Sequence, residues 1–476
     1  MVQPLVGDRK QLNDRVDPDH VNIMLAAELT EMTFQEREKV YDELHGVDKV
    51  THETESMLVT TLTAMELAIQ QMPNRAVYDE AKRVNARYVE DRSFRLMFLR
   101  SEYYNAERAA SRLVTFLEQK VKFFGEDTLA RPVYMSDLNK YDIAVLKSGI
   151  LQLIPERDRS GRVILSDFNR GPASVEQPKD SNTYMKALIY IVLAAAEDEE
   201  TQKRGLIGML YFTDALPLIQ QLYRRQGPRL FDWLPIKLVG VHFCYDDPRF
   251  RILQAVLLLM MGKERRIRVR IHEGTDTECQ YKLLTFGIPV SHFPVGYEGE
   301  LKNAAHLKWL GRRVVKETAL QLNQRFDGID LPCHGDVLLG RGKTLQNHGG
   351  NVTLRNMIAE YLPEYRATPK KEKGNVAWKV VMAMKGRGGR FLKREPNGWW
   401  IEVSDETARE KISMTYRTSR SPSGLQHRHK SSERDPLQFL EPAMKRPKRQ
   451  DGEEPGVVDY SISRYAPSCQ NSCWGE

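Results

Sequence analysis

The segment whose residue types could bind a phosphate lies in the last third of the chain. Gly340-Arg341-Gly342-Lys343-Thr344 combines backbone freedom with two cations and a hydroxyl group, which is the composition of a phosphate-binding loop. A Walker loop also needs a glycine five residues before Gly342, where this sequence has Val337. We therefore reject a nucleotide-hydrolysing loop and expect only that the segment can hold one phosphate of a nucleic-acid backbone.

Other residues that could do chemistry are too scattered to form a catalytic or metal site. Cys333, His334 and His348 would make half of a zinc site, but zinc takes four ligands and no second cysteine pair lies nearby. His242 lies in an apolar run and is predicted to be a hydrogen-bonded core histidine. No serine–histidine–aspartate, cysteine–histidine or paired-carboxylate spacing is typical of catalysis. We predict that the protein is not an enzyme and holds no metal.

Basic residues are concentrated in the C-terminal part of the chain. The 476 residues carry a net charge of +7, yet residues 332–420 alone carry +8 and residues 421–450 carry +4. Residues 451–476 carry −4, and residues 1–331 are near −1. This asymmetry favours an acidic partner for the basic part, either nucleic acid or an anionic membrane surface.

The composition and the terminal segments indicate an intracellular protein. No apolar run approaches the ~20 residues of a membrane-spanning helix, and the N-terminus lacks the apolar core of a signal peptide. Five cysteines, an odd number, suggest free thiols in a reducing compartment. A short cationic run resembles a nuclear import signal, the alternative being a solvated run in a disordered tail. Its cations are Lys445, Arg446, Lys448 and Arg449. We expect the nucleus or the cytoplasm, with the nucleus slightly favoured.

The spacing of apolar residues predicts a helical N-terminal module followed by a sheet domain. Residues 1–20 are polar and expected to be flexible, and residues 21–130 have helical periodicity, including a helix that Thr33 can cap and Gly46 can end. Residues 131–302 alternate between apolar runs and helical patterns, which predicts an α/β domain. Strands are expected at 150–154, 163–165, 205–212, 237–243 and 267–271, with helices at 184–196, 216–225, 249–261 and 277–286.

Several of these segments resemble, in order, landmarks of the CRAL-TRIO, or Sec14-like, lipid-binding domain. The turn Arg157-Asp158-Arg159-Ser160-Gly161-Arg162 between two strands resembles the opening of that domain. Pro248-Arg249-Phe250 resembles the entrance to its mobile gate helix, and residues 249–261 resemble the gate itself. Gly296-Tyr297-Glu298-Gly299 resembles the closing loop. The resemblance extends over residues 80–310 and includes the N-terminal helical module.

The resemblance implies a Sec14-like mixed sheet and the non-enzymatic binding of a lipid-like ligand, with no other cofactor. Residues 252–261 are apolar on nearly all sides, so this helix must be buried on both faces. The alternative is an ordinary buried helix of an α/β domain. Burying apolar surface at ~25 cal/mol per Å² is enough to hold a long lipid chain. We predict that the pocket is lined by Leu153, Ile207, Met209, Tyr211, Val239, Val241, Phe243, Leu253, Val256, Leu257 and Met260.

A charged helix over 303–332 is expected to link this domain to a second one at 333–417, before a disordered tail at 418–476. The second domain resembles an uncharacterised family that is abundant in diatom proteins. The residues that carry this resemblance are Asp336, Gly340, Arg341, Gly342, His348, Asn351, Gly389, Phe391 and Trp399. The family has no established activity, so the resemblance implies a module without a chemistry.

The residues of this module predict a small α+β domain of order α-α-β-β-α. Pro396-Asn397-Gly398 is a turn signal between two strands, and Ser404 can cap the last helix. A helix followed by a basic hairpin can contact the phosphates of DNA, the alternatives being a peptide-binding or merely solvated module. The expected nucleic-acid or anion contacts are Arg341, Lys343, Lys379, Lys385, Arg387, Arg390, Lys393 and Arg394.

The sequence therefore predicts a protein with two binding modules. The first binds a lipid or similar hydrophobic molecule, and the second contacts nucleic acid, as in a nuclear regulator. A lipid-transfer protein whose basic module contacts anionic membranes or a partner protein is the first alternative. A structural adaptor with an empty pocket is the second.

Overall fold

The computed structural model describes residues 17–47, 50–168, 182–212, 227–248, 250–290, 293–295 and 300–418. Contacts within the chain group Met1–Tyr416 into one compact unit and set apart Arg417–Glu476. The expected helix at 216–225, the import signal and the tail from 419 onward lie outside the described residues, as does most of the flexible start. The finer division of the chain into domains stays a prediction.

The N-terminal part is helical, as its apolar spacing predicts. Thr33 caps α3 (Phe34–His45) through a capping box with Glu36, and Gly46 ends the helix with a φ of 66°. α7 buries an apolar face that includes Leu113, Val114 and Leu117, and it ends at Gly125. The helices α4, α5 and α6 pack around it. The bounds are α2 (Pro18–Glu31), α4 (Glu55–Gln71), α5 (Ala76–Val89), α6 (Arg92–Ser101), α7 (Ala106–Phe124) and α8 (Lys140–Ser148).

A five-stranded mixed sheet follows, with its strands in chain order. β1 is antiparallel to β2, and β2 to β5 are parallel, so helices must return the chain between the parallel strands. The strands are β1 (Leu151–Leu153), β2 (Val163–Phe168), β3 (Leu206–Phe212), β4 (Leu238–Tyr245) and β5 (Val269–Glu273). The helices are α9 (Thr183–Ala196), α10 (Glu199–Arg204), α12 (Phe250–Met260), α13 (Lys263–Arg266) and α14 (Asp276–Thr285). The α/β prediction is confirmed.

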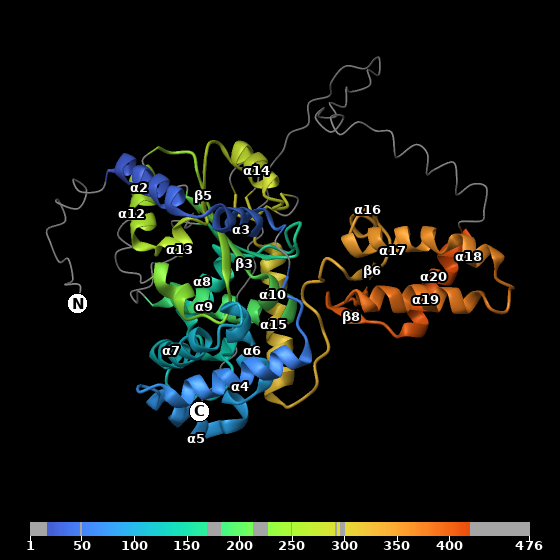
Figure 1. The fold of residues 1–476 in the computed structure, drawn as a ribbon, viewed down its shortest axis with the longest axis horizontal. Helices are drawn as coiled ribbons and strands as arrows, with labels where there is room; N and C mark the ends of the chain where they lie inside the picture. The colour runs from blue at the N-terminus through green and yellow to red at the C-terminus, as the bar shows by residue number, and fades with distance from the viewer. Residues whose placement is uncertain are drawn as a thin grey trace, which may run out of the picture. The chain divides into compact units, whose positions relative to one another are not determined.

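The two faces of this sheet are covered by different helices (Figure 1). One face, which includes Phe212 and Val241, packs against α12, and α2 packs beside α12. The opposite face, which includes Ile207 and Met209, packs against α14 and the segment that follows it. Successive side chains of a strand point to opposite faces, so the all-apolar β3 contributes to both cores.

The helix that was expected as a linker, α15 (Ala304–Gln321), is part of the body. Trp309 and Leu310 enter the main hydrophobic core. Arg313, only 2% exposed, pairs with Glu197 on the loop after α9 and with Glu317 one turn along α15. The helix is therefore held on the body by both apolar packing and a buried ion-pair network.

The C-terminal module is a small α+β domain with one strand more than its sequence predicted. The predicted hairpin forms from β7 and β8, and a parallel strand, β6, pairs with the other side of β7. The predicted first helix is divided into α17 and α18, with Pro363 in the first turn of the second. The elements are β6 (Val337–Leu339), α16 (Lys343–Gln346), α17 (Gly349–Glu360), α18 (Leu362–Ala367), α19 (Lys373–Gly386), β7 (Phe391–Arg394), β8 (Trp400–Glu402) and α20 (Asp405–Thr418).

Candidate functional site

The sheet face beneath α12 is lined with aromatic rings. Phe212 of β3 stacks on Phe243 of β4 and on Phe250 of α12, with ring centroids 5.5 and 5.4 Å apart. Tyr245 continues the row, and its hydroxyl group donates to Gln254 Oε1 at 2.6 Å. The amide oxygen of Gln254, a polar side chain on α12, thus has a hydrogen-bond donor inside the core. The surface beneath the helix is apolar enough to hold a hydrocarbon chain.

The outer side of α12 also carries apolar side chains. Ile252 is 39% exposed and Leu259 is 44% exposed, whereas Leu257 and Leu258 are buried against the sheet. Nearby α13 is tied to α2 by an ion pair between Lys263 and Glu31 at 2.8 Å. α12 is therefore a covering helix with apolar residues on both its inner and its outer surface, and α13, which follows it, is tied to α2 by a surface ion pair.

The structure does not bring the predicted pocket-lining residues together on one face. Val241, Phe243 and Leu257 meet beneath α12, with Val256 half-buried on that helix. Leu153 packs at the edge of the main core. The side chains of Leu253 and Met260 lie outside the described residues. Four lining residues belong instead to the opposite face, beneath α14. These are Ile207, Met209, Tyr211 and Val239.

Sequence reasoning therefore merged two faces and missed part of the row beneath α12. Every residue of β3 except Gly208 has a sizeable apolar side chain, so the alternation that distinguishes the faces of a strand is absent. Phe212, Tyr245 and Phe250 were omitted. Phe212 and Phe250 lie at or near the ends of predicted elements, and Tyr245 lies two residues beyond the predicted strand.

The opposite face holds a buried pair of histidines. His242 Nδ1 and His272 Nε2 are 2.9 Å apart on the neighbouring strands β4 and β5, and the rings are stacked. His242 is fully buried, which confirms the predicted hydrogen-bonded core histidine. Burial, together with the neighbouring His272, holds the pKa of His242 well below its usual value. Burial likewise lowers the pKa of His272 to about 4.

In the C-terminal module, the charged motif residue Asp336 has an architectural role. Its buried carboxylate accepts hydrogen bonds from the backbone N–H groups of Cys333 and Arg390, at 2.7 and 3.1 Å. The Arg390 guanidinium donates to both of its oxygens, at 3.1 and 2.8 Å. Arg390 was expected to contact nucleic acid, and the structure instead uses it to join the start of β6 to the start of β7.

Other motif residues also build the fold. Asn351 lies on the free edge of β6, where its amide accepts from Leu338 N–H at 2.7 Å and donates to Leu338 C=O at 2.9 Å. Asn351 thus takes the place of a neighbouring strand. Phe391 and Trp399 are buried, and Gly389 packs on the backbone of Gly335. The motif residues without such a role are those of the exposed loop 340–342 and His348, which precedes α17.

The remaining predicted cations differ in whether a carboxylate neutralises them. Lys379 donates to Glu364 at 2.6 Å, and Lys385 pairs with Asp405. Lys393 is 3.7 Å from Glu395. The side chain of Lys343 lies outside the described residues. Three exposed arginines have no carboxylate partner among the residues that the structure describes. They are Arg341, Arg387 and Arg394.

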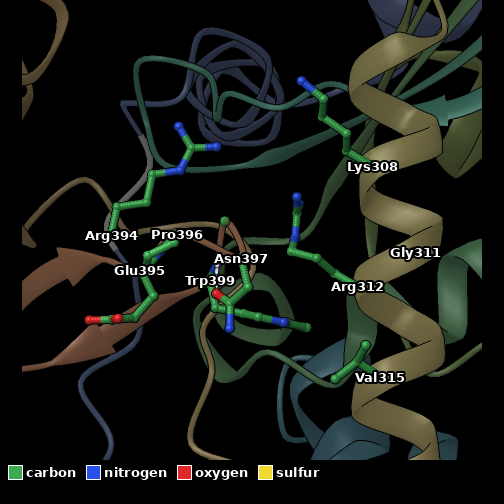
Figure 2. A pocket seen from close by; sticks show the side chains of 10 residues that line it. Lys308, Gly311, Arg312, Val315, Arg394, Glu395, Pro396, Asn397 and Trp399 are labelled. Atoms are coloured by element: carbon green, nitrogen blue, oxygen red, sulfur yellow. Dashed lines mark hydrogen bonds between the residues drawn. The ribbon is translucent and has the colours of Figure 1, made fainter.

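A cleft of about 460 Å³ lies between α15 and the turn that joins β7 to β8 (Figure 2). Sequence reasoning assigned no function to the α15 residues in it, because the spacing of a charged helix gives no sign of what it will face. The lining residues are Lys308, Gly311, Arg312, Val315, Arg394, Glu395, Pro396, Asn397, Gly398 and Trp399.

Two features are absent from the described part of the chain. None of its helices combines the length and the apolar character needed to cross a membrane. Over the same residues, no group of three or more histidine, cysteine, aspartate or glutamate side chains is arranged to hold a metal ion.

One comparison with known proteins matches the C-terminal module. A family model described as "Domain of unknown function (DUF6824)" matches residues 336–418. No curated protein matches the chain. Among solved structures, the one titled "Crystal structure of Sfh5" aligns over 56% of this chain and 100% of its own, with 9% identity and a TM-score of 0.36.

Proposed function

We propose that the α/β body binds a lipid-like ligand on the sheet face that α12 covers, and that it catalyses no reaction. The observation that supports this most is the combination of an aromatic sheet face with a covering helix that keeps Ile252 and Leu259 exposed. A helix that only completed a core would be expected to present polar residues to water. The resemblance of this segment to the gate of CRAL-TRIO domains points in the same direction.

The physical basis is an exchange of apolar contacts. α12 packs directly on the sheet, so a ligand would enter when α12 moves outward, and lipid chains would replace the contacts of Leu257 and Leu258. Apolar burial contributes ~25 cal/mol per Å², whichever partner provides it. During the exchange, Ile252 and Leu259 would contact the membrane that supplies the ligand.

Exchanging both exposed residues for glutamate is expected to prevent loading. In the double variant Ile252→Glu, Leu259→Glu, the amount of lipid that co-purifies with the full-length protein should fall about 10-fold, because two charges would oppose contact with a membrane. Lipid extracted from the purified proteins would be quantified by mass spectrometry.

A matched control changes two exposed apolar residues on the opposite side of the sheet, in the variant Tyr281→Glu, Leu284→Glu of α14. This control should retain its lipid. Wild-type protein that carries no lipid, or equal losses in the two variants, would contradict the proposal.

We further propose that the C-terminal module contacts nucleic acid through the edge of the sheet formed by the carboxyl ends of β6 and β7. The strands are parallel and Leu339 pairs with Lys393, so Arg341, two residues beyond Leu339, lies at the same edge as Lys393 and Arg394. These side chains are exposed and belong to a part of the chain whose net charge is +8. An anionic membrane is the alternative partner for the same charges.

Removing two of these charges is expected to weaken DNA binding and its dependence on salt. For Arg341→Gln, Arg394→Gln, the plot of log K against log salt concentration should become less steep, its slope falling in magnitude by about 2. The control Lys379→Gln, Lys385→Gln changes the net charge equally but removes cations that carboxylates already neutralise. A mobility-shift titration at several salt concentrations measures both.

Two outcomes would count against nucleic acid as the partner. If the two double variants weakened DNA binding equally, the binding would depend only on the net charge of the module and not on this surface. Flotation of the protein with anionic liposomes, together with no shift of DNA, would assign the edge to membranes.

A further inference from the structure

We propose that the cleft between α15 and the β7–β8 turn binds a small phosphate-bearing molecule. Three cationic side chains reach it from two separate elements, Lys308 and Arg312 from α15 and Arg394 from the end of β7. Figure 2 shows their nitrogen atoms turned toward the same space above the turn. The site is independent of lipid binding beneath α12 and does not need the module to bind nucleic acid.

The charges in the cleft leave a surplus of cations. Lys308 and Arg394 are exposed and have no carboxylate partner within the described ranges. Arg312 Nε donates to Asp330 at 3.2 Å. This bond uses only Nε, so the terminal nitrogens of the guanidinium can donate to a ligand. The one acidic lining residue, Glu395, directs its carboxylate away from these cations in Figure 2. An anion entering the cleft would therefore be attracted by the unpaired cations Lys308 and Arg394, and it could accept hydrogen bonds from the terminal nitrogens of Arg312.

The rigidity of the walls suits a specific site. The guanidinium of Arg312 lies 5.7 Å from the ring centroid of Trp399, which is buried and in turn contacts Phe326 edge to face. Arg394 lies 5.9 Å from the ring centroid of Trp400. Both arginines are thus held against aromatic rings, so less side-chain freedom is lost when a ligand binds.

The size of the cleft favours a small molecule over a polymer. Its volume of about 460 Å³ is within the range of about 300–1,000 Å³ that ligand sites of proteins occupy. Arginine and lysine together are the residues that proteins use for phosphate, with arginine forming paired hydrogen bonds to two oxygens. A phosphate ester could come from a soluble metabolite or from the head group of a lipid.

The experiment measures binding of two probes to the full-length protein. Inorganic pyrophosphate is titrated by calorimetry, and vesicles of phosphatidylcholine with a minor share of phosphatidic acid are tested by co-sedimentation. The variant Lys308→Gln, Arg394→Gln should weaken binding of the effective probe about 10-fold, because each charge-assisted hydrogen bond contributes to affinity. Both residues are exposed, so the variant should fold, which its thermal unfolding midpoint checks.

A control variant and the pattern of binding decide the outcome. Arg366→Gln, Arg387→Gln removes two exposed cations of the module that lie outside the cleft and outside the proposed nucleic-acid surface, and it should change the Kd less than about 2-fold. Saturable binding of pyrophosphate with this pattern supports a soluble ligand, and the same pattern for the vesicles alone supports a lipid head group. Failure to bind either probe, or equal weakening in both variants, would overturn the site.

Discussion

Replacing Asp336 with alanine is expected to destabilise the C-terminal module by about 3–5 kcal/mol, as the loss of one partner of a buried ion pair usually does. The carboxylate is fully buried and accepts hydrogen bonds from two backbone N–H groups and from the Arg390 side chain. Its removal leaves the guanidinium without its counter-ion and two backbone donors without an acceptor. A module of this size has only a few kcal/mol of stability to lose, so a large fraction should be unfolded at 25 °C.

Hydrogen exchange of peptides from α19 and β7 in a urea series would measure this loss in the module alone. The control is Glu364→Ala, which breaks the exposed pair with Lys379 and should cost about 0–1 kcal/mol. A loss at Asp336 no larger than at Glu364 would show that Asp336 is not an architectural residue. Nucleic-acid binding by a folded Asp336 variant would be a separate measurement, because Asp336 does not reach the exposed edge.

Where local physical signals were strong, the sequence predicted the fold well. The Thr33 capping box and Gly46 delimit α3, and the Pro-Asn-Gly turn at 396–398 produces the β7–β8 hairpin. The expected strands of the body all form, with small differences at their ends. The strand β6 was missed because its three residues are too short for a periodic pattern and its partner, β7, follows more than fifty residues later.

The candidate sites were harder to predict because they depend on which elements face one another. Met209 and Phe212 are both apolar residues of β3, yet they enter different cores. Arg390 and Arg394 are equivalent by residue type, but only Arg390 meets a buried carboxylate. Lys308 lies on a helix that packs on the body, and it lines a cleft only because the β7–β8 turn lies opposite. None of these relations is encoded in local spacing.

Lowering the pH from 7 to 5 is expected to reduce the free energy of unfolding of the body through His242 and His272, by about 2 kcal/mol from His272 alone and further from His242. Both pKa values are lower in the folded protein than the ordinary value of 6.5, mainly because of burial. Below pH 6.5, each histidine binds a proton in the unfolded chain but stays neutral in the folded one. The unfolded state is therefore favoured progressively, by about 1.4 kcal/mol for each histidine and pH unit, until the pH reaches the folded pKa.

The double variant His242→Gln, His272→Gln should lose most of this pH dependence, even if it is less stable at pH 7. Hydrogen exchange of β4 and β5 peptides in urea at the two pH values measures the body separately from the module. Burial also lowers the pKa values of His306 and His348, which remain in the variant, so the informative quantity is the difference between wild type and variant. In the control variant His20→Gln, which changes an exposed histidine, the free energy of unfolding should fall with decreasing pH as it does in the wild type. An equal fall in the double variant would mean that the buried pair takes up protons without unfolding, and that the sheet face beneath α14 opens to water.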